Sequence, residues 1–159
     1  MIYVGIDSGK SGGIAFVSKE DGHCVMPLPD AYELNQLIKN WQADFGIIHC
    51  FLERAHAFPG QGTVSMFSYG EQYGRIQGIL ISNEIPYTLV QPREWQMEMF
   101  KGTKDKQAGE KRNPKDRALE IVRRLFPKER FIATLRSKKP HDGMIDSILI
   151  AECCRRKII

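Results

Sequence analysis

The 159-residue sequence has no long apolar run, no Cys-x-x-Cys motif and no phosphate-binding glycine signature. Nothing in it approaches the roughly 20 apolar residues that cross a bilayer, so we expect no membrane-spanning helix. The opening MIYVGIDSGK has no basic head and no cleavage site, and it is typical of a buried strand rather than a signal peptide. The glycines at 9–13 have neither the P-loop nor the dinucleotide-binding spacing, so we expect no small-molecule cofactor of those kinds.

The four cysteines also exclude a familiar class of site. Cys24, Cys50, Cys153 and Cys154 have no metal-ligand spacing with any histidine. Unpaired cysteines without such spacing are typical of reduced thiols in a cytoplasmic protein. We therefore expect neither a zinc site nor a disulfide framework.

The composition predicts one globular domain over residues 1–159. Hydrophobic residues make up 42% of the chain and charged residues 26%, which is ordinary for a folded protein. The length is sufficient for one full hydrophobic core and short for two. No internal repeat is present.

The net charge of +4 is unevenly distributed. Residues 101–139 contain 14 Lys and Arg against five Asp and Glu, a net charge of +9, which leaves −5 for the other residues. A basic block on a mildly acidic body favours a polyanionic partner. A solvated, lysine-rich loop is the alternative that charge alone leaves open.

Hydrophobic periodicity predicts an α/β fold. Strands are expected at 2–6, 14–17, 24–26, 45–52 and 87–90, and helices at 31–41, 64–81, 92–100, 114–126 and from 141 or 142 to about 156. The segment 101–113 has no periodicity and is expected to be a loop. Strands that first form a meander and then alternate with helices indicate a mixed five-stranded sheet with helices on both faces.

Four acidic residues fall where catalytic carboxylates are commonly found. Asp7 ends the first predicted strand and Glu53 ends the apolar strand 45–52. Asp142 and Asp146 lie four residues apart at the start of the last helix, which places both on one face. Hard oxygen ligands of this kind suit Mg²⁺ or Mn²⁺ rather than zinc. Two such ions about 4 Å apart would clamp the attacking and leaving oxygens of a phosphodiester.

Each acid also has a structural interpretation. Asp7 precedes a glycine turn, where Asp is a common turn residue, and Asp142 is a good helix N-cap. Glu53 needs a partner because it terminates a very apolar strand. Asp146 has the weakest structural explanation of the four.

Several motifs resemble RuvC-type Holliday junction resolvases, particularly their phage-borne and plastid relatives. IDSGKSGGIAF at 6–16 resembles the family's first-strand motif, and HDGMIDSILIA at 141–151 resembles its closing helix. Leu52-Glu53, the PGQG at 59–62, the glycine-containing helix and the helix 115–127 follow the family's order. The likeness covers nearly the whole chain. Ser8 stands where the family usually has Pro, and Ile145 replaces a common Ala.

The resemblance implies a ribonuclease H-like fold and a set of functional residues. Asp7, Glu53, Asp142 and Asp146 would bind two Mg²⁺ ions, with Mn²⁺ able to substitute and His141 the alternative fourth ligand. Lys115 would assist catalysis, although simple surface solvation is equally consistent with its position. The expected DNA-binding residues are Met66, Phe67, Arg75, Lys101, Lys104, Lys106, Lys111, Arg112, Lys115, Lys138 and Lys139.

Met66 and Phe67 have two interpretations. In resolvases of this type, residues at this point wedge into the junction, and an apolar wedge can unstack a base step. Alternatively, both side chains belong to the core at helical spacing. Gly70, Gly74 and Gly78 share one face of the same predicted helix and would allow another backbone to approach closely.

Three functions are compatible with these observations. The first is a metal-dependent endonuclease that resolves Holliday junctions in DNA recombination and repair by paired symmetric nicks. The second is a ribonuclease H-like nuclease acting on flaps, forks or RNA–DNA hybrids, and the third is a non-catalytic nucleic-acid-binding module. All four acids are present, which argues against the third. Two nicks in a two-fold junction predict a homodimer, with the helix 64–81 as its interface. We expect a cytoplasmic, nucleoid-associated protein, of bacterial, phage or organellar origin.

Overall fold

A computed structural model describes residues 1–56, 60, 62–103, 106–107 and 110–158. Its main sheet has five strands in the order β3-β2-β1-β4-β5. The three N-terminal strands pair antiparallel, whereas β1 with β4 and β4 with β5 pair parallel. The strands are β1 (Ile2–Asp7), β2 (Gly13–Val17), β3 (His23–Pro27), β4 (Ile47–Glu53) and β5 (Tyr87–Val90).

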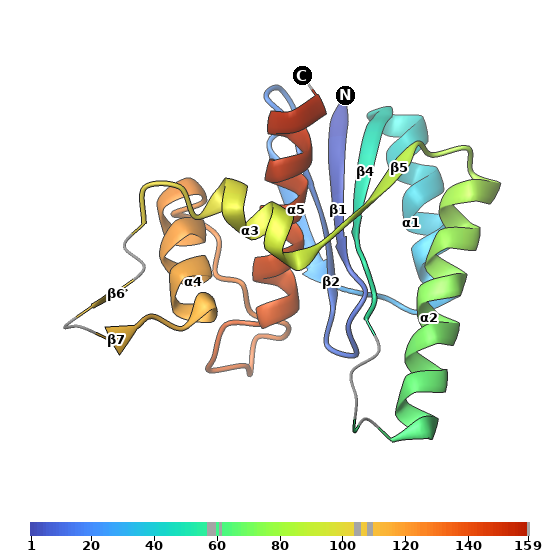
Figure 1. The fold of residues 1–159 in the computed structure, drawn as a ribbon. Helices are drawn as coiled ribbons and strands as arrows, with labels where there is room; N and C mark the ends of the chain where they lie inside the picture. Colours follow the sequence, from blue (N-terminus) through green and yellow to red (C-terminus); the bar gives the residue numbers. More distant parts are fainter. Residues whose placement is uncertain (57–59, 61, 104–105, 108–109, 159) are drawn as a thin grey trace.

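Helices cover both faces of this mixed sheet (Figure 1). The helices are α1 (Ala31–Asp44), α2 (Thr63–Ser82), α3 (Pro92–Met99), α4 (Pro114–Leu125) and α5 (Asp142–Ile158). Helices α1 and α2 pack on one face and α3, α4 and α5 on the other, with the N-terminal end of α5 against the β1–β2 turn. The predicted α/β class and element order are therefore confirmed.

Two predicted segments differ from the structure. The segment 101–113 was expected to lack regular structure, yet β6 (Lys106–Gln107) and β7 (Glu110–Lys111) pair antiparallel. Two-residue strands are too short to show a period in the sequence, which explains the error. The strand expected at 45–52 begins two residues later, because Phe45 is the C-cap of α1 and Gly46 has a φ of +72°.

The sheet separates two hydrophobic clusters. Ile2, Val4 and Ile6 of β1 pack with α1 and α2 on one face. Phe51 of β4 packs with α3, α4 and α5 on the other. Because side chains alternate along a strand, Asp7 and Glu53 point to the same side as Phe51, the side that α5 covers.

Backbone contact between glycines brings α5 down onto the sheet. A Cβ on Gly143 would lie 2.2 Å from the Ser11 carbonyl oxygen, and one on Gly13 would lie 2.3 Å from the Gly143 carbonyl oxygen. Close approach was predicted instead for the three glycines of α2. A Cβ on Gly70, Gly74 or Gly78 would meet nothing within 4 Å in this chain, so no backbone approaches this glycine face within the single chain.

Among the described residues, no helix is long and apolar enough to span a membrane. All four cysteines are free, and Cys50, Cys153 and Cys154 are buried.

Candidate active site

The ends of β1 and β4 place two of the predicted acids side by side. Ile6 and Leu52 are partners in the parallel pairing of these strands, and the next residue on each is Asp7 and Glu53. Neighbouring strands lie about 4.8 Å apart, so two carboxylates share one edge of the sheet. The Asp7 carboxylate accepts a 2.9 Å hydrogen bond from the Gly9 backbone N–H, as a turn Asp does.

The first turn of α5 brings the other two acids to the same edge. His141 precedes the helix and its Nδ1 accepts a 3.2 Å hydrogen bond from the Met144 backbone N–H. The capping position suggested for Asp142 therefore belongs to His141, and Asp142 is the first helical residue. Asp146 lies one turn further on and is half-buried, whereas Asp142 is exposed.

The pKa values show that these acids form one electrostatic unit. Burial, with the charges of Asp7, Glu53 and Asp142 added, raises the pKa of Asp146 to about 8. Burial and the charge of Asp7 raise the pKa of Glu53 to about 7, despite an opposing hydrogen bond from Trp95. Burial also raises the pKa of Asp7. Clustered, desolvated carboxylates with raised pKa values are typical of functional sites.

Lys115 supplies a positive charge to this cluster. It lies in the first turn of α4, and its ammonium group donates to the Asp142 carboxylate. This hydrogen bond raises the pKa of Lys115, and the charge of Asp146 contributes in the same direction. Lys115 thus interacts with two of the acids, which favours a role at this cluster over simple surface solvation.

Sequence reasoning missed three residues that contact the acids or their strands. The Trp95 indole N–H donates to Glu53 Oε2 at 2.5 Å. The fully buried Ser8 hydroxyl donates to the Glu53 carbonyl oxygen and lies 3.3 Å from the Tyr69 hydroxyl. Ser8 was noted only as a departure from Pro, and nothing in sequence spacing connects α2 or α3 with the end of β4.

The cluster has the chemistry of a divalent-cation site. Its donors are carboxylate oxygens, which suit Mg²⁺ or Mn²⁺. Burial and, after it, the charges of neighbouring acids raise the pKa values of Glu53 and Asp146, and a dication would oppose both effects. Within the described ranges, however, no group of three His, Cys, Asp or Glu side chains is arranged to hold a metal ion.

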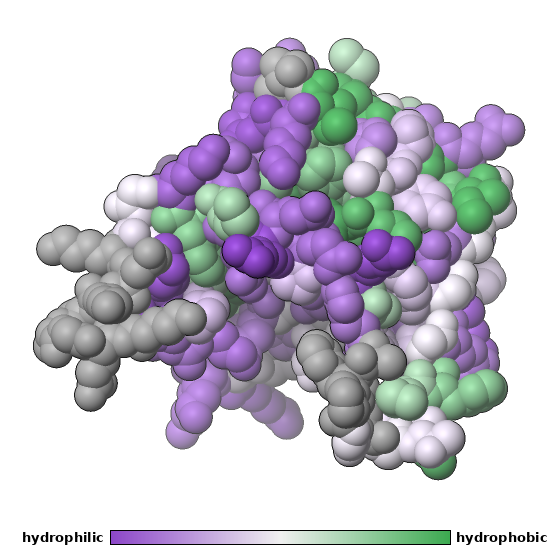
Figure 2. Space-filling view, in the orientation of Figure 1, coloured by the Kyte–Doolittle hydropathy of each residue, from purple (hydrophilic) through white to green (hydrophobic). Residues whose placement is uncertain are grey.

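The two predicted wedge residues are on the surface. Met66 is 37% exposed and Phe67 75% exposed, in the first turns of α2, so neither belongs to the core. Val64, also in the first turn of α2, is 83% exposed. Figure 2 shows pale and hydrophobic residues at the lower end of α2, with hydrophilic residues further along the helix. The start of α2 therefore presents several exposed apolar side chains.

The predicted cationic residues are distributed over a wide surface. Lys138 and Lys139 are exposed in the segment before α5. Lys101 pairs with Glu98, and Arg112 with Glu120. Lys106 and Lys111 belong to β6 and β7, and Lys104 lies outside the described residues.

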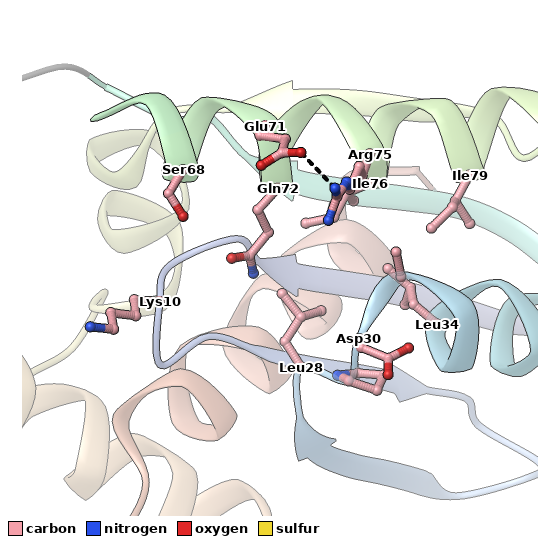
Figure 3. Close-up of a pocket in the computed structure, with 12 residues that line it drawn as sticks. Lys10, Leu28, Asp30, Leu34, Ser68, Glu71, Gln72, Arg75, Ile76 and Ile79 are labelled. Carbon is pink, nitrogen blue, oxygen red and sulfur yellow. Dashed lines mark hydrogen bonds and ion pairs between the residues drawn. The ribbon is translucent and has the colours of Figure 1, made fainter. Parts of the chain in front are cut away.

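A cavity of about 340 Å³ separates α2 from the N-terminal part of α1 (Figure 3). Ser68 and Gln72 extend from α2 toward it, and Lys10, on the β1–β2 turn, lies at one end. Arg75 is held by an ion pair with Glu71 of the same helix, at 2.5 Å. That pair engages one nitrogen of the guanidinium group, and Arg75 is exposed, so other N–H donors remain for the predicted DNA-binding role.

The architecture matches that of solved Holliday junction resolvases. Thermus thermophilus RuvC in complex with a Holliday junction substrate is 14% identical, with a TM-score of 0.59 over 96% of this chain and 92% of that one. T. thermophilus RuvC alone gives 14% identity and a TM-score of 0.56 over 98% and 96% of the two chains. The yeast mitochondrial Holliday junction resolvase Ydc2 is 17% identical, with a TM-score of 0.55 over 96% of this chain and 77% of that one. No protein-family model and no curated protein sequence matches the chain.

These likenesses define the class of fold. The chain has the ribonuclease H-like α/β fold, and its arrangement is that of the RuvC-type resolvases. At 14–17% identity the comparison concerns the fold alone.

Proposed function

We propose that this protein is a metal-dependent endonuclease that resolves Holliday junctions. The observation that supports the proposal is the convergence of Asp7, Glu53 and Asp146 at the N-terminal end of α5, with Lys115 beside Asp142. A cluster of buried negative charge does not favour phosphate binding unless a cation compensates it. The presence of this cluster on a RuvC-type fold favours a nuclease over a non-catalytic binding module.

The chain's own residues have separable roles in this proposal. Asp7, Glu53, Asp142 and Asp146 would bind two Mg²⁺ or Mn²⁺ ions, with His141 as the alternative to Asp142. Bound there, the ions would supply an activated water and stabilise the leaving 3′-oxygen. Lys115 would release Asp142 to the metal and turn to the scissile phosphate. Met66 and Phe67 would enter the branch point, where base stacking is already interrupted.

We further propose that the protein acts as a homodimer through α2. Gly70, Gly74 and Gly78 are exposed on one face of that helix, and Phe67 and the 63% exposed Ile81 flank them. A glycine-lined helix face permits a second helix to approach closely. In this arrangement two copies would place two active sites on one two-fold junction.

The function is tested by cutting of a synthetic, immobile four-way junction. The assay compares wild type with Asp146→Asn in Mg²⁺ and in EDTA, with linear duplex, splayed-arm and hybrid substrates alongside. Asp44→Asn, an exposed change at the end of α1, is the matched control. In Mg²⁺ we expect wild type and Asp44→Asn to make paired nicks on the junction. Asp146→Asn should make none, and EDTA should abolish the nicks in every variant. Preferred cutting of flaps or hybrids would instead assign a ribonuclease H-like nuclease for those substrates. Junction binding without cutting would assign a non-catalytic nucleic-acid-binding module.

The dimer is tested by light scattering of Gly74→Arg against Ala43→Arg. Both place a long cation at an exposed helical position, on α2 and α1 respectively. We expect only Gly74→Arg to give a monomer and to convert paired cuts into single nicks. A wild-type monomer, with and without junction DNA, would refute the dimer.

A further inference from the structure

Trp95 is a fully buried tryptophan whose one polar atom contacts a predicted metal ligand. Its side chain is 1% exposed and packs in the cluster beneath α5, with the Phe100 ring 6.1 Å away edge-on. The indole N–H donates to Glu53 Oε2 at 2.5 Å. A buried indole N–H normally has a hydrogen-bond partner, but the partner here is a half-buried carboxylate at the candidate active site.

The fold holds Trp95 in place through the start of its helix. Val90, at the end of β5, is the register partner of Glu53, so the strand leading into α3 runs alongside the acid. Gln91 and Glu94 form a capping box, and Pro92 occupies the first turn of α3. The position of the indole is therefore fixed by the backbone as well as by packing.

We propose that Trp95 is a positioning residue that orients the Glu53 carboxylate for divalent metal binding. The indole engages one carboxylate oxygen and fixes the rotation of the group, which leaves the other oxygen for the metal. Hydrogen-bond partners of metal ligands act in this way, and their removal typically costs about 10- to 100-fold in metal affinity. This inference rests on the proposed metal-dependent function.

Trp95 also fills space in the core, so a loss of packing must be separated from a loss of the donor. Trp41 provides the matched control, because it is the other tryptophan of the chain and is buried on the opposite face of the sheet at 6% exposure. It packs against Phe16, with ring centroids 4.9 Å apart. Trp41→Phe and Trp95→Phe make the same chemical change in two different cores.

The experiment measures Mn²⁺ binding to the full chain without DNA, from the electron paramagnetic resonance signal of the free ion. Wild type, Trp95→Phe, Trp41→Phe and Glu53→Gln are compared, and thermal melting monitors folding. A further variant replaces the Trp95 indole with benzothiophene, which keeps the ring shape and lacks the N–H. Trp41→Phe leaves Trp95 as the one tryptophan, and its fluorescence follows titration with diamagnetic Mg²⁺.

We expect Trp95→Phe and the benzothiophene variant to bind Mn²⁺ about 10- to 100-fold more weakly, with Trp41→Phe unchanged. Trp95 fluorescence should change with Mg²⁺ and reach saturation, and Glu53→Gln should abolish that response. Unchanged Mn²⁺ affinity in a folded benzothiophene variant would overturn the inference. An equal loss of Mn²⁺ affinity in Trp41→Phe would also overturn it, and so would a wild type that binds no metal. Trp95-dependent metal binding without junction cutting would leave the inference standing and refute the proposed function.

Discussion

The raised pKa values of two acids make the metal-free protein sensitive to alkaline pH. Folding raises the pKa of Glu53 to about 7 and that of Asp146 to about 8, both above the ordinary carboxyl range. The folded state therefore retains protons that the unfolded chain has released. The stability from these groups is complete below the unfolded pKa values and is lost as the pH rises through about 7 to 8.

We therefore expect the melting temperature in EDTA to fall between pH 6 and pH 9. Asp146→Asn should melt higher than wild type at pH 9 and show a flatter profile, because it removes the most strongly shifted group. The measurement is thermal unfolding by circular dichroism across this range. Asp44→Asn should follow the wild-type profile, and an equal flattening in that control would show that the effect does not arise at the acid cluster.

Lys115 should contribute to cutting more than to DNA binding. Replacing it with Met removes the ammonium group that lies beside Asp142 and acts on Asp146. Loss of such a preorganised charge near the reacting phosphate costs on the order of 100-fold in rate. Single-turnover cutting at saturating enzyme and a binding titration measure the two effects. Lys139→Met, an exposed change outside the cluster, should weaken binding slightly and leave the saturated rate unaltered.

At the level of elements, the contact of α5 with β1 and β2 determines whether the acids meet. Gly143→Ala would place a Cβ 2.2 Å from the Ser11 carbonyl oxygen, so α5 or the turn must shift. We expect a loss of about 1–3 kcal/mol in the free energy of unfolding, as for other overpacked sites, together with weaker Mn²⁺ binding. Urea denaturation at low protein concentration measures the free energy of unfolding.

Gly74→Ala, measured in the same urea experiment, should have the opposite effect on the free energy of unfolding. The new Cβ meets nothing within 4 Å in the chain, and alanine is the better helix former. We expect the free energy of unfolding of the monomer to rise by about 0.5–1 kcal/mol. A loss at Gly74 as large as that at Gly143 would contradict the assignment of the close contact to α5.

At the level of the whole molecule, the distribution of charge should govern affinity for DNA. Residues 101–139 have a net charge of +9, and the rest of the chain has a net charge of −5. Binding by counterion release gives a slope of about −0.9 per neutralised phosphate when log K is plotted against log salt. Lys138→Gln with Lys139→Gln should reduce this slope by up to about 2 and leave single-turnover cutting at saturation intact.

The salt titration needs a control of equal charge. Lys19→Gln with Lys39→Gln removes two exposed cations outside the basic block, at the β2–β3 turn and on α1. We expect an unchanged slope for that pair. Equal reductions in both double variants would mean that net charge, rather than the 101–139 block, sets the affinity.

The sequence by itself determined the elements and the identity of the acids. Apolar runs and helical spacing placed the five main strands and five helices. A strand that is covered on both faces is apolar along its length, whereas a helix that is buried on one face repeats its apolar residues with each turn. Asp7 and Glu53 were recognisable because each charge ends an apolar strand. The short β6–β7 pair was missed, because two-residue strands are too short to show a period in the sequence.

Only the tertiary structure decided how distant segments meet. It placed Trp95 on Glu53, Tyr69 beside Ser8, Lys115 on Asp142, and Gly143 against the β1–β2 turn. It also showed that Met66 and Phe67 are exposed, which helical spacing left open. The physical reason is that these contacts depend on the packing of α2, α3, α4 and α5 about the sheet. Local periodicity specifies which face of a helix is buried, but it does not specify which residue of another element that face will meet.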